Sequence, residues 1–157
     1  MGLARRISDR LTLAGGVLLL GMAVLVTASV LRRRLTSQGV PGDFELLQTG
    51  LAVAVFAFMP LCQLRGGNLF VDTFSGRLPL AVRLRLDAMW ALTYAGVATL
   101  IAVMMTVGAF ETLRSGTRSM VLGLPQGWPI AVSAALAAWL AFVVLLAALD
   151  TFRMGEP

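Results

Sequence analysis

Residues 129–149 read PIAVSAALAAWLAFVVLLAAL, and this stretch decides the fold of the chain. It contains no charged side chain. At a rise of about 1.5 Å per residue, a helix of this length crosses the roughly 30 Å hydrocarbon core of a bilayer. Lipid offers no hydrogen-bond partner to a free backbone amide, so a segment buried in it must be helical. We therefore predict a transmembrane helix here.

Three further stretches have the same character, at residues 11–31, 44–64 and 88–110. The whole chain of 157 residues is 58% hydrophobic and only 13% charged. A water-soluble domain of this size could not bury so much apolar surface. The sequence therefore predicts an all-α membrane protein in which four transmembrane helices form a single domain over residues 1–157.

The ends of these segments carry helix signals. Asp43 follows a Pro-Gly pair and is predicted to cap the second helix, and Asp87 is predicted to cap the third. Pro129 stands where the first turn of a helix tolerates proline. Pro60 lies inside the second segment and should kink that helix near its end.

The connector at residues 65–86 is unlike an ordinary loop, because bulky apolar residues alternate in it with arginines. A segment with one apolar face and one basic face lies in the headgroup plane of a membrane. We therefore expect an interfacial amphipathic connector, formed by one or two short helices and broken near residues 76–79. A solvated loop with scattered apolar residues is the alternative.

The N-terminal end raises the questions of cleavage and orientation. Residues 1–10 are basic and resemble the start of a signal peptide, but the apolar run that follows is long and ends in Arg32, Arg33 and Arg34. An uncleaved first helix is therefore favoured. With both termini in the cytoplasm, the short inner segments hold eight arginines and the outer ones five. This bias favours cytoplasmic termini, although the run of three arginines opposes it.

The residues for catalysis or cofactor binding are few. The chain has no histidine and a single cysteine, which argues against haem ligation, histidine-based metal sites, catalytic triads and an intrachain disulfide. We expect neither an enzyme nor a cofactor. Glu111 and Asp150 stand at helix ends, where water solvates them. Glu45 is the better candidate for a specific contact, because Gln48 and Thr49 share its helical surface.

The remaining signals concern packing and anchoring. Ala134 and Ala138 belong to a series of small residues four apart in the last segment, a spacing that allows close helix approach either within the chain or with a partner. Trp90 and Trp128 stand at segment ends and suit interfacial anchors, whereas Trp139 lies in the middle of its segment. The arginines flank apolar runs, so the basic charge indicates a lipid bilayer and not a nucleic acid.

Several short motifs occur in a characteristic order. Residues 43–45 read DFE at the start of the second helix, residues 65–72 read RGGNLFVD, residues 77–79 read RLP, and residues 119–128 read SMVLGLPQGW. Together with four apolar segments at matching spacing, they resemble the small membrane subunits (DctQ type) of tripartite ATP-independent periplasmic (TRAP) transporters. The resemblance covers roughly residues 5 to 150.

This resemblance implies a scaffold that binds no substrate. A large TRAP membrane subunit (DctM type) would hold the substrate and sodium sites, and a periplasmic substrate-binding protein would deliver an organic acid. The chain would lie in the bacterial cytoplasmic (inner) membrane with both termini cytoplasmic, and any sodium would bind to the large subunit. The candidate residues for a partner interface or a membrane anchor are Glu45, Gln48, Asn68, Asp72, Arg77, Arg83, Arg85, Pro125 and Trp128.

Three other functions were weighed against the scaffold. An autonomous four-helix carrier or channel needs an acidic residue deep in the membrane, and the apolar runs contain none in their middle. A membrane anchor for a redox enzyme usually supplies histidine ligands to a haem, which this chain lacks. An anchor or assembly subunit of another membrane complex needs no particular residues, so the sequence does not exclude this function.

Overall fold

The computed structural model describes the backbone of residues 2–65 and 80–154. It forms four helices: α1 (Gly2–Thr36), α2 (Asp43–Leu64), α3 (Leu80–Ser115) and α4 (Gly127–Met154). Each of them is long and apolar enough to cross a membrane. The predicted class, an all-α membrane protein with four transmembrane helices, is confirmed.

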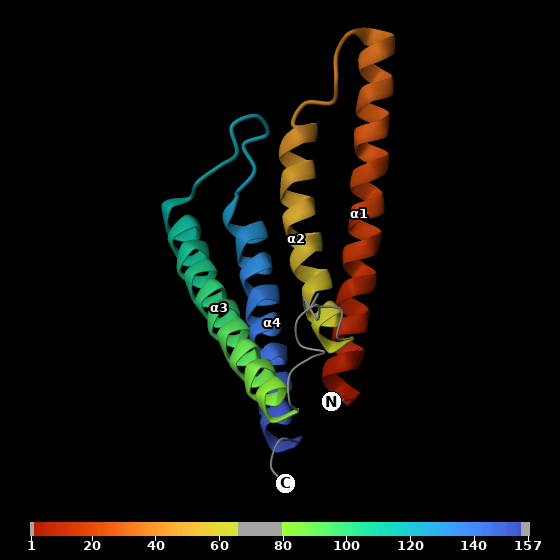
Figure 1. Cartoon of the computed structure of the whole chain (residues 1–157). Coiled ribbons are helices and arrows are strands. Elements are labelled where there is room, and N and C mark those ends of the chain that lie inside the picture. Colours follow the sequence, from red (N-terminus) through yellow and green to blue (C-terminus); the bar gives the residue numbers. More distant parts are fainter. Residues whose placement is uncertain (1, 66–79, 155–157) are drawn as a thin grey trace.

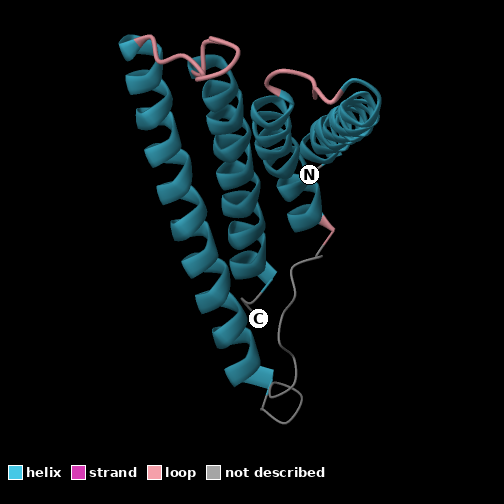
Figure 2. Cartoon of the chain, turned by 90° about the horizontal axis from the view of Figure 1, so that it is seen from above, coloured by secondary structure: helices cyan, strands magenta, loops and turns pink. Residues whose placement is uncertain are grey.

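The helices stand in a row in the order α1, α2, α4, α3, and do not close into a bundle (Figures 1 and 2). α1 packs against α2, α2 against α4, and α4 against α3. The inner position of α4 is visible in its burial, since 44% of its most apolar stretch is buried, compared with 11% for α1. Two broad apolar faces therefore remain open along the row.

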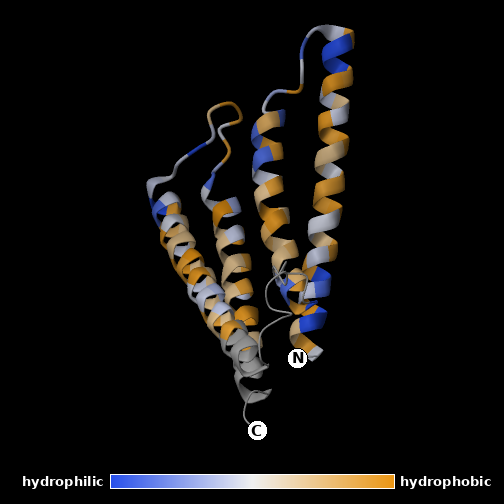
Figure 3. Ribbon diagram, viewed as in Figure 1, coloured by the Kyte–Doolittle hydropathy of each residue, from blue (hydrophilic) through white to orange (hydrophobic). Residues whose placement is uncertain are grey.

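One end of the helices, called the loop end below, carries the two segments that join α1 to α2 and α3 to α4, residues 37–42 and 116–126. The opposite end, called the terminal end, carries the start of α1 and the end of α4 (Figure 1). Charged residues gather at both ends of α1, and the helix between them is apolar (Figure 3).

Small side chains make the closest helix contact. Ala95, Ala98 and Ala102 of α3 pack against Ala137 and Ala141 of α4, where all five are buried. With no hydrophobic force between helices in lipid, such close backbone approach is what van der Waals packing requires. At these positions the small residues of α4 serve packing within the chain, whereas Ala135 and Ala138 are exposed.

The helix boundaries differ from the prediction in two places. α2 has Gly42 as its N-cap and Asp43 as its first residue, so the expected cap at Asp43 is wrong. α3 begins at Leu80, which places Asp87 inside the helix and makes the expected cap at Asp87 wrong. Residues 80–86, expected in the connector, continue into α3. Residues 66–79 of the connector lie outside the described part of the chain.

Both prolines noted in the sequence lie in helices. Pro129 is in the first turn of α4, as predicted. Pro60 lies inside α2, where it is buried and has no N–H to donate to the carbonyl of the preceding turn. The carbonyl left without this bond is that of Phe56. The next carbonyl, that of Ala57, accepts a hydrogen bond from the Thr12 hydroxyl of α1 at 3.3 Å. The interrupted turn of α2 is therefore held against α1.

Candidate functional site

The loop between α3 and α4 is attached to the first turn of α2 by one carboxylate. Glu45 Oε1 accepts a hydrogen bond from the backbone N–H of Val121 at 2.9 Å, and Oε2 accepts one from the N–H of Leu122 at 3.2 Å. A carboxylate is well suited to this task, because its two oxygens accept from two neighbouring amides at once. Glu45 thus ties together segments that lie 76 residues apart.

The loop is also held together by hydrogen bonds of its own, which centre on Ser119. Its N–H donates to the Leu124 carbonyl at 2.9 Å, and its Oγ accepts from the Leu124 N–H at 3.2 Å. The Ser119 carbonyl also accepts from the N–H of Gly123, which has a left-handed φ of +63°. Arg118 pairs with Pro125 across the base of the turn. The loop therefore presents its two amides side by side to Glu45.

An apolar contact accompanies this polar one. Gly42 is buried and has a φ of +74°, and a Cβ atom built there would overlap the side chain of Leu122. A glycine meets both demands, since it tolerates the left-handed region and leaves room for the leucine. We call the contact of Gly42 and Glu45 with Val121 and Leu122 the loop latch. It leaves Met120 fully exposed at the tip of the loop.

A second network joins the end of α1 to the start of α2. The Ser29 hydroxyl is buried, donates to the carboxylate of Asp43 and accepts from the N–H of Val40 at 3.1 Å. Arg33 lies 3.8 Å from the same carboxylate. One member of the arginine run at the end of α1 therefore has a structural partner, which the sequence did not indicate. Ser29 gave no signal beyond being a small polar residue in an apolar run.

The terminal end has polar contacts of its own. The indole N–H of Trp139 donates to the hydroxyl of Ser8 at 3.1 Å, and Ser8 is fully buried. Arg65 and Asp9 form an ion pair at 3.6 Å. Trp139, in the middle of its segment, therefore packs against protein and not only against lipid.

Only part of the predicted set comes together in the structure. Glu45 makes a specific contact, but with loop amides and not with Gln48 or Thr49. Gln48 is exposed one turn further along α2. Pro125 lies at the base of the latched loop, and Trp128 is 68% exposed in the first turn of α4. The assignment of Trp128 to an interfacial anchor stays a prediction.

The remaining predicted residues lie beyond what the structure describes. Asn68, Asp72 and Arg77 fall within residues 66–79, which are outside the described part of the chain. Arg83 and Arg85 belong to the backbone of α3, and their side chains are not among the described ones. Their assignment to an anchor or an interface stays a prediction.

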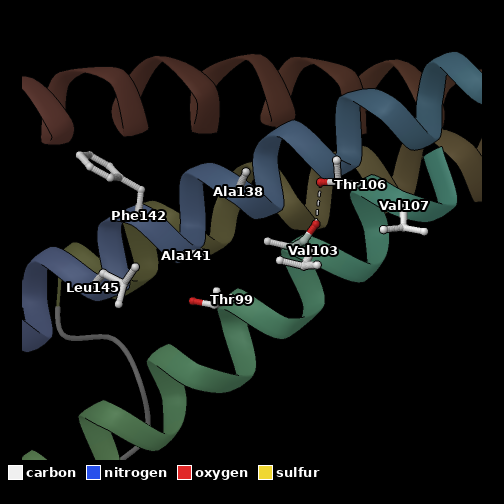
Figure 4. A pocket seen from close by; sticks show the side chains of 9 residues that line it. Thr99, Val103, Thr106, Val107, Ala138, Ala141, Phe142 and Leu145 are labelled. Atoms are coloured by element: carbon white, nitrogen blue, oxygen red, sulfur yellow. Dashed lines mark hydrogen bonds between the residues drawn. The ribbon is translucent and has the colours of Figure 1, made fainter. Parts of the chain in front are cut away.

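A groove between α3 and α4 was considered as a binding site (Figure 4). It has a volume of about 430 Å³, and the side chains of Val103, Phe142 and Leu145 line it. Its two hydroxyls, those of Thr99 and Thr106, each donate at 2.7 Å to the carbonyl four residues earlier in α3. The side chains that line the groove therefore offer a polar solute no free hydrogen-bond donor.

Metal-binding chemistry is also missing from the described residues. Among them, no three His, Cys, Asp or Glu side chains lie close enough together to hold a metal ion. What this end of the molecule provides is a rigid shape. The latched loop and the α1–α2 network fix an exposed apolar tip relative to the helices.

Replacing Glu45 with glutamine is expected to loosen the latched loop. A glutamine offers one acceptor oxygen, and its amide group would face the second N–H as another donor. Trypsin should then cut after Arg118 several-fold faster in detergent micelles. Gln48→Ala is the matched control, because Gln48 is exposed one turn away and outside the latch. Equal cleavage rates in both variants would show that Glu45 does not hold the loop.

Comparison with known proteins gives one result. The model of the family described as "Tripartite ATP-independent periplasmic transporters, DctQ component" matches residues 22–154, which is most of the chain. No curated protein and no solved structure matches it. The matched region includes Arg32, Arg33 and Arg34, the latched loop, the C-terminal part of α1 and the whole of α2, α3 and α4.

Proposed function

The chain belongs to the DctQ component family of TRAP transporters, and from that premise we propose that it is a static scaffold beside a larger, substrate-carrying subunit. Membership makes it the small membrane subunit of such a transporter, which works together with other components. The scaffold role, the coupling ion and the substrate are the parts that we propose.

The observation that carries the proposal is the open row of helices. A protein that works alone in a membrane usually closes its helices around a site, whereas here the outer helices α1 and α3 each pack mainly against one neighbour. Beyond these contacts, Ser8 of α1 accepts a hydrogen bond from Trp139 of α4. Large apolar side chains remain more than half exposed along them, such as Leu13 and Val24 of α1 and Leu100 and Met104 of α3. Such faces suit contact with lipid on one side and a partner subunit on the other.

The polar chemistry of the described residues agrees with a supporting role. Asp9 lies at the terminal end of the helices, and Asp43 and Glu45 lie at the loop end. Each of them forms an ion pair or hydrogen bonds within the chain. A carrier usually keeps an ionisable residue inside the membrane to bind its solute or coupling ion. The fixed ends and the open apolar faces are better explained by a platform that holds its position while a partner moves.

The partner, the coupling ion, the substrate and the orientation are further parts of the proposal. We propose that the partner is a large subunit of the DctM type, that it couples uptake of an organic acid to sodium, and that a periplasmic binding protein delivers the acid. The start of α1 and the end of α4 both lie at the terminal end of the helices, which supports placing both termini on one side of the membrane (Figure 1). We place them in the cytoplasm and the protein in the inner membrane.

The test is reconstitution with and without this chain. A tagged chain is co-expressed with the large subunit, purified in detergent and placed in proteoliposomes with the binding protein outside. We expect a stable one-to-one complex, and sodium-driven uptake that is lost when the chain is omitted. Vesicles containing the chain alone are the control, and they should move no solute.

Two results would contradict the proposal. If the chain alone formed a homo-oligomer and moved solute, it would be a carrier and not a scaffold. If the large subunit alone gave full uptake at the same protein density, the chain would not be needed for transport. Purification with some other membrane complex would instead point to an assembly subunit.

A further inference from the structure

A second groove lies between α1 and α2 at the terminal end, and its lining includes Leu13 of the open face of α1. Its volume is about 530 Å³. Most of its wall is apolar and is made by six residues of the two helices: Leu13, Gly16, Val17, Leu20, Phe58 and Leu61. Thr12 also lines it, and its hydroxyl donates to the Ala57 carbonyl at 3.3 Å.

One end of this groove is charged. Asp9 and Arg65 line it there and face each other at 3.6 Å, with their side chains about half exposed to solvent. Asp9 precedes the apolar run of α1 and Arg65 follows that of α2, which places the pair at the edge of the apolar layer. An ion pair this exposed contributes little by itself and exchanges readily for other charged partners.

The length of the groove limits what it can hold. From Asp9 to Leu20 the helix rises about 16 Å, which is close to one leaflet, or half of the roughly 30 Å hydrocarbon core. A helix from a partner subunit would need a surface that continues through both leaflets. An apolar wall as long as one leaflet, with a pair of opposite charges at its outer end, matches a single lipid in both length and charge.

We propose that this groove binds one phospholipid with a zwitterionic, primary-amine headgroup. The acyl chain lies along Gly16, where the missing side chain leaves the wall open. Arg65 binds the phosphate, for which its planar guanidinium is suited, and Asp9 accepts hydrogen bonds from the ammonium group. When the lipid binds, the ion pair between Asp9 and Arg65 is replaced by two ion pairs with the headgroup, one between Arg65 and the phosphate and one between Asp9 and the ammonium group. This proposal does not rest on the transport role.

Filling the groove tests the acyl-chain contact. A Cβ atom added to Gly16 meets nothing within 4 Å, so Gly16→Leu projects into the groove without displacing the chain's own atoms. Gly21→Leu is the matched control, because Gly21 is equally open, lies in the same helix and is not part of the groove lining. The full chain is equilibrated in mixed micelles with equal amounts of phosphatidylethanolamine, phosphatidylglycerol and phosphatidylcholine, and bound lipid is counted by native mass spectrometry.

The unsubstituted chain and Gly21→Leu should each retain one phosphatidylethanolamine, and Gly16→Leu should lose it. Equal retention by Gly16→Leu and Gly21→Leu would overturn the proposal. So would a Gly16→Leu chain that keeps its lipid but no longer purifies with the large subunit, since a partner segment would then occupy the groove.

The headgroup contacts are tested separately. Removing one charge-assisted contact should weaken binding roughly tenfold. Arg65→Gln should therefore reduce the binding of all three lipids, because each carries a phosphate. Asp9→Asn should remove the preference for phosphatidylethanolamine over phosphatidylcholine, whose quaternary amine donates no N–H hydrogen bond. If the unsubstituted chain bound the three lipids equally, the proposed role of Asp9 would be wrong. If Arg65→Gln left the binding of all three unchanged, the proposed role of Arg65 would be wrong.

Discussion

Gly42→Val is expected to release the loop latch and to destabilise the start of α2. The φ of +74° at Gly42 lies in the left-handed region, which costs a residue with a side chain about 1–2 kcal/mol. A Cβ atom there would also overlap the side chain of Leu122. Forcing extra atoms into a filled contact costs about 1–3 kcal/mol, so the combined loss is about 2–5 kcal/mol.

The backbone and packing contributions of this substitution can be separated. Gly116 has a φ of +63°, but a Cβ atom added there meets nothing within 4 Å. Gly116→Val therefore carries the backbone cost alone. The thermal midpoint in detergent, followed by fluorescence-detected size exclusion, should fall clearly further for Gly42→Val than for Gly116→Val. Equal falls would show that Leu122 can leave Gly42 without loss, and that the latch depends on Glu45 alone.

The four spans were predictable because bilayer thickness sets a length that apolar runs must reach. Their ends were not, because the polar residues that flank a run need not stop the helix. α1 continues through Arg32, Arg33 and Arg34 to Thr36, since arginine is a good helix former and its charge is favourable at a helix C-terminus. α3 starts at Leu80, directly after a proline in the sequence, so Asp87 was misjudged as the first opportunity for a cap.

The order of the helices in the row had no signal in the sequence. Lipid tails are as apolar as the helix surfaces, so no hydrophobic force selects which faces meet, and small residues occur in all four segments. The spacing of alanines in α4 predicted a close approach to another helix, but it did not indicate that this helix would be α3. The row is therefore a property of side-chain fit, which hydropathy does not report.

The sequence predicted one residue of the candidate site, Glu45, but not the groups that it binds. Glu45 stood out because Gln48 and Thr49 share its helical surface. Its actual partners are the N–H groups of Val121 and Leu122, and backbone amides leave no trace in residue identity. Ser29 was missed for a related reason, because one hydroxyl in an apolar run looks the same whether it bonds its own helix or a neighbouring one. Only the fold brings it to Asp43.

Gly15→Leu should have the second large effect, by separating α1 from α2. Gly15 is buried where the two helices approach most closely. A Cβ atom added there would lie 2.9 Å from the Cβ of Ala57 and 3.5 Å from the backbone oxygen of Ala54. Ala57 is part of the α2 helix and cannot rotate away, so one helix has to move. The cost of such overpacking is about 1–3 kcal/mol, and it also threatens the hydrogen bond from Thr12 to Ala57.

The sign of a smaller substitution decides whether packing is the cause. Replacing glycine by alanine inside a helix ordinarily stabilises it by about 0.5–1 kcal/mol, because the unfolded chain loses freedom. Gly21→Ala, in open space on the same helix, should therefore raise the thermal midpoint. Gly15→Ala should lower it, and Gly15→Leu should lower it further. A rise for Gly15→Ala would mean that α1 and α2 tolerate a wider separation, and that their contact does not depend on the missing side chain at Gly15.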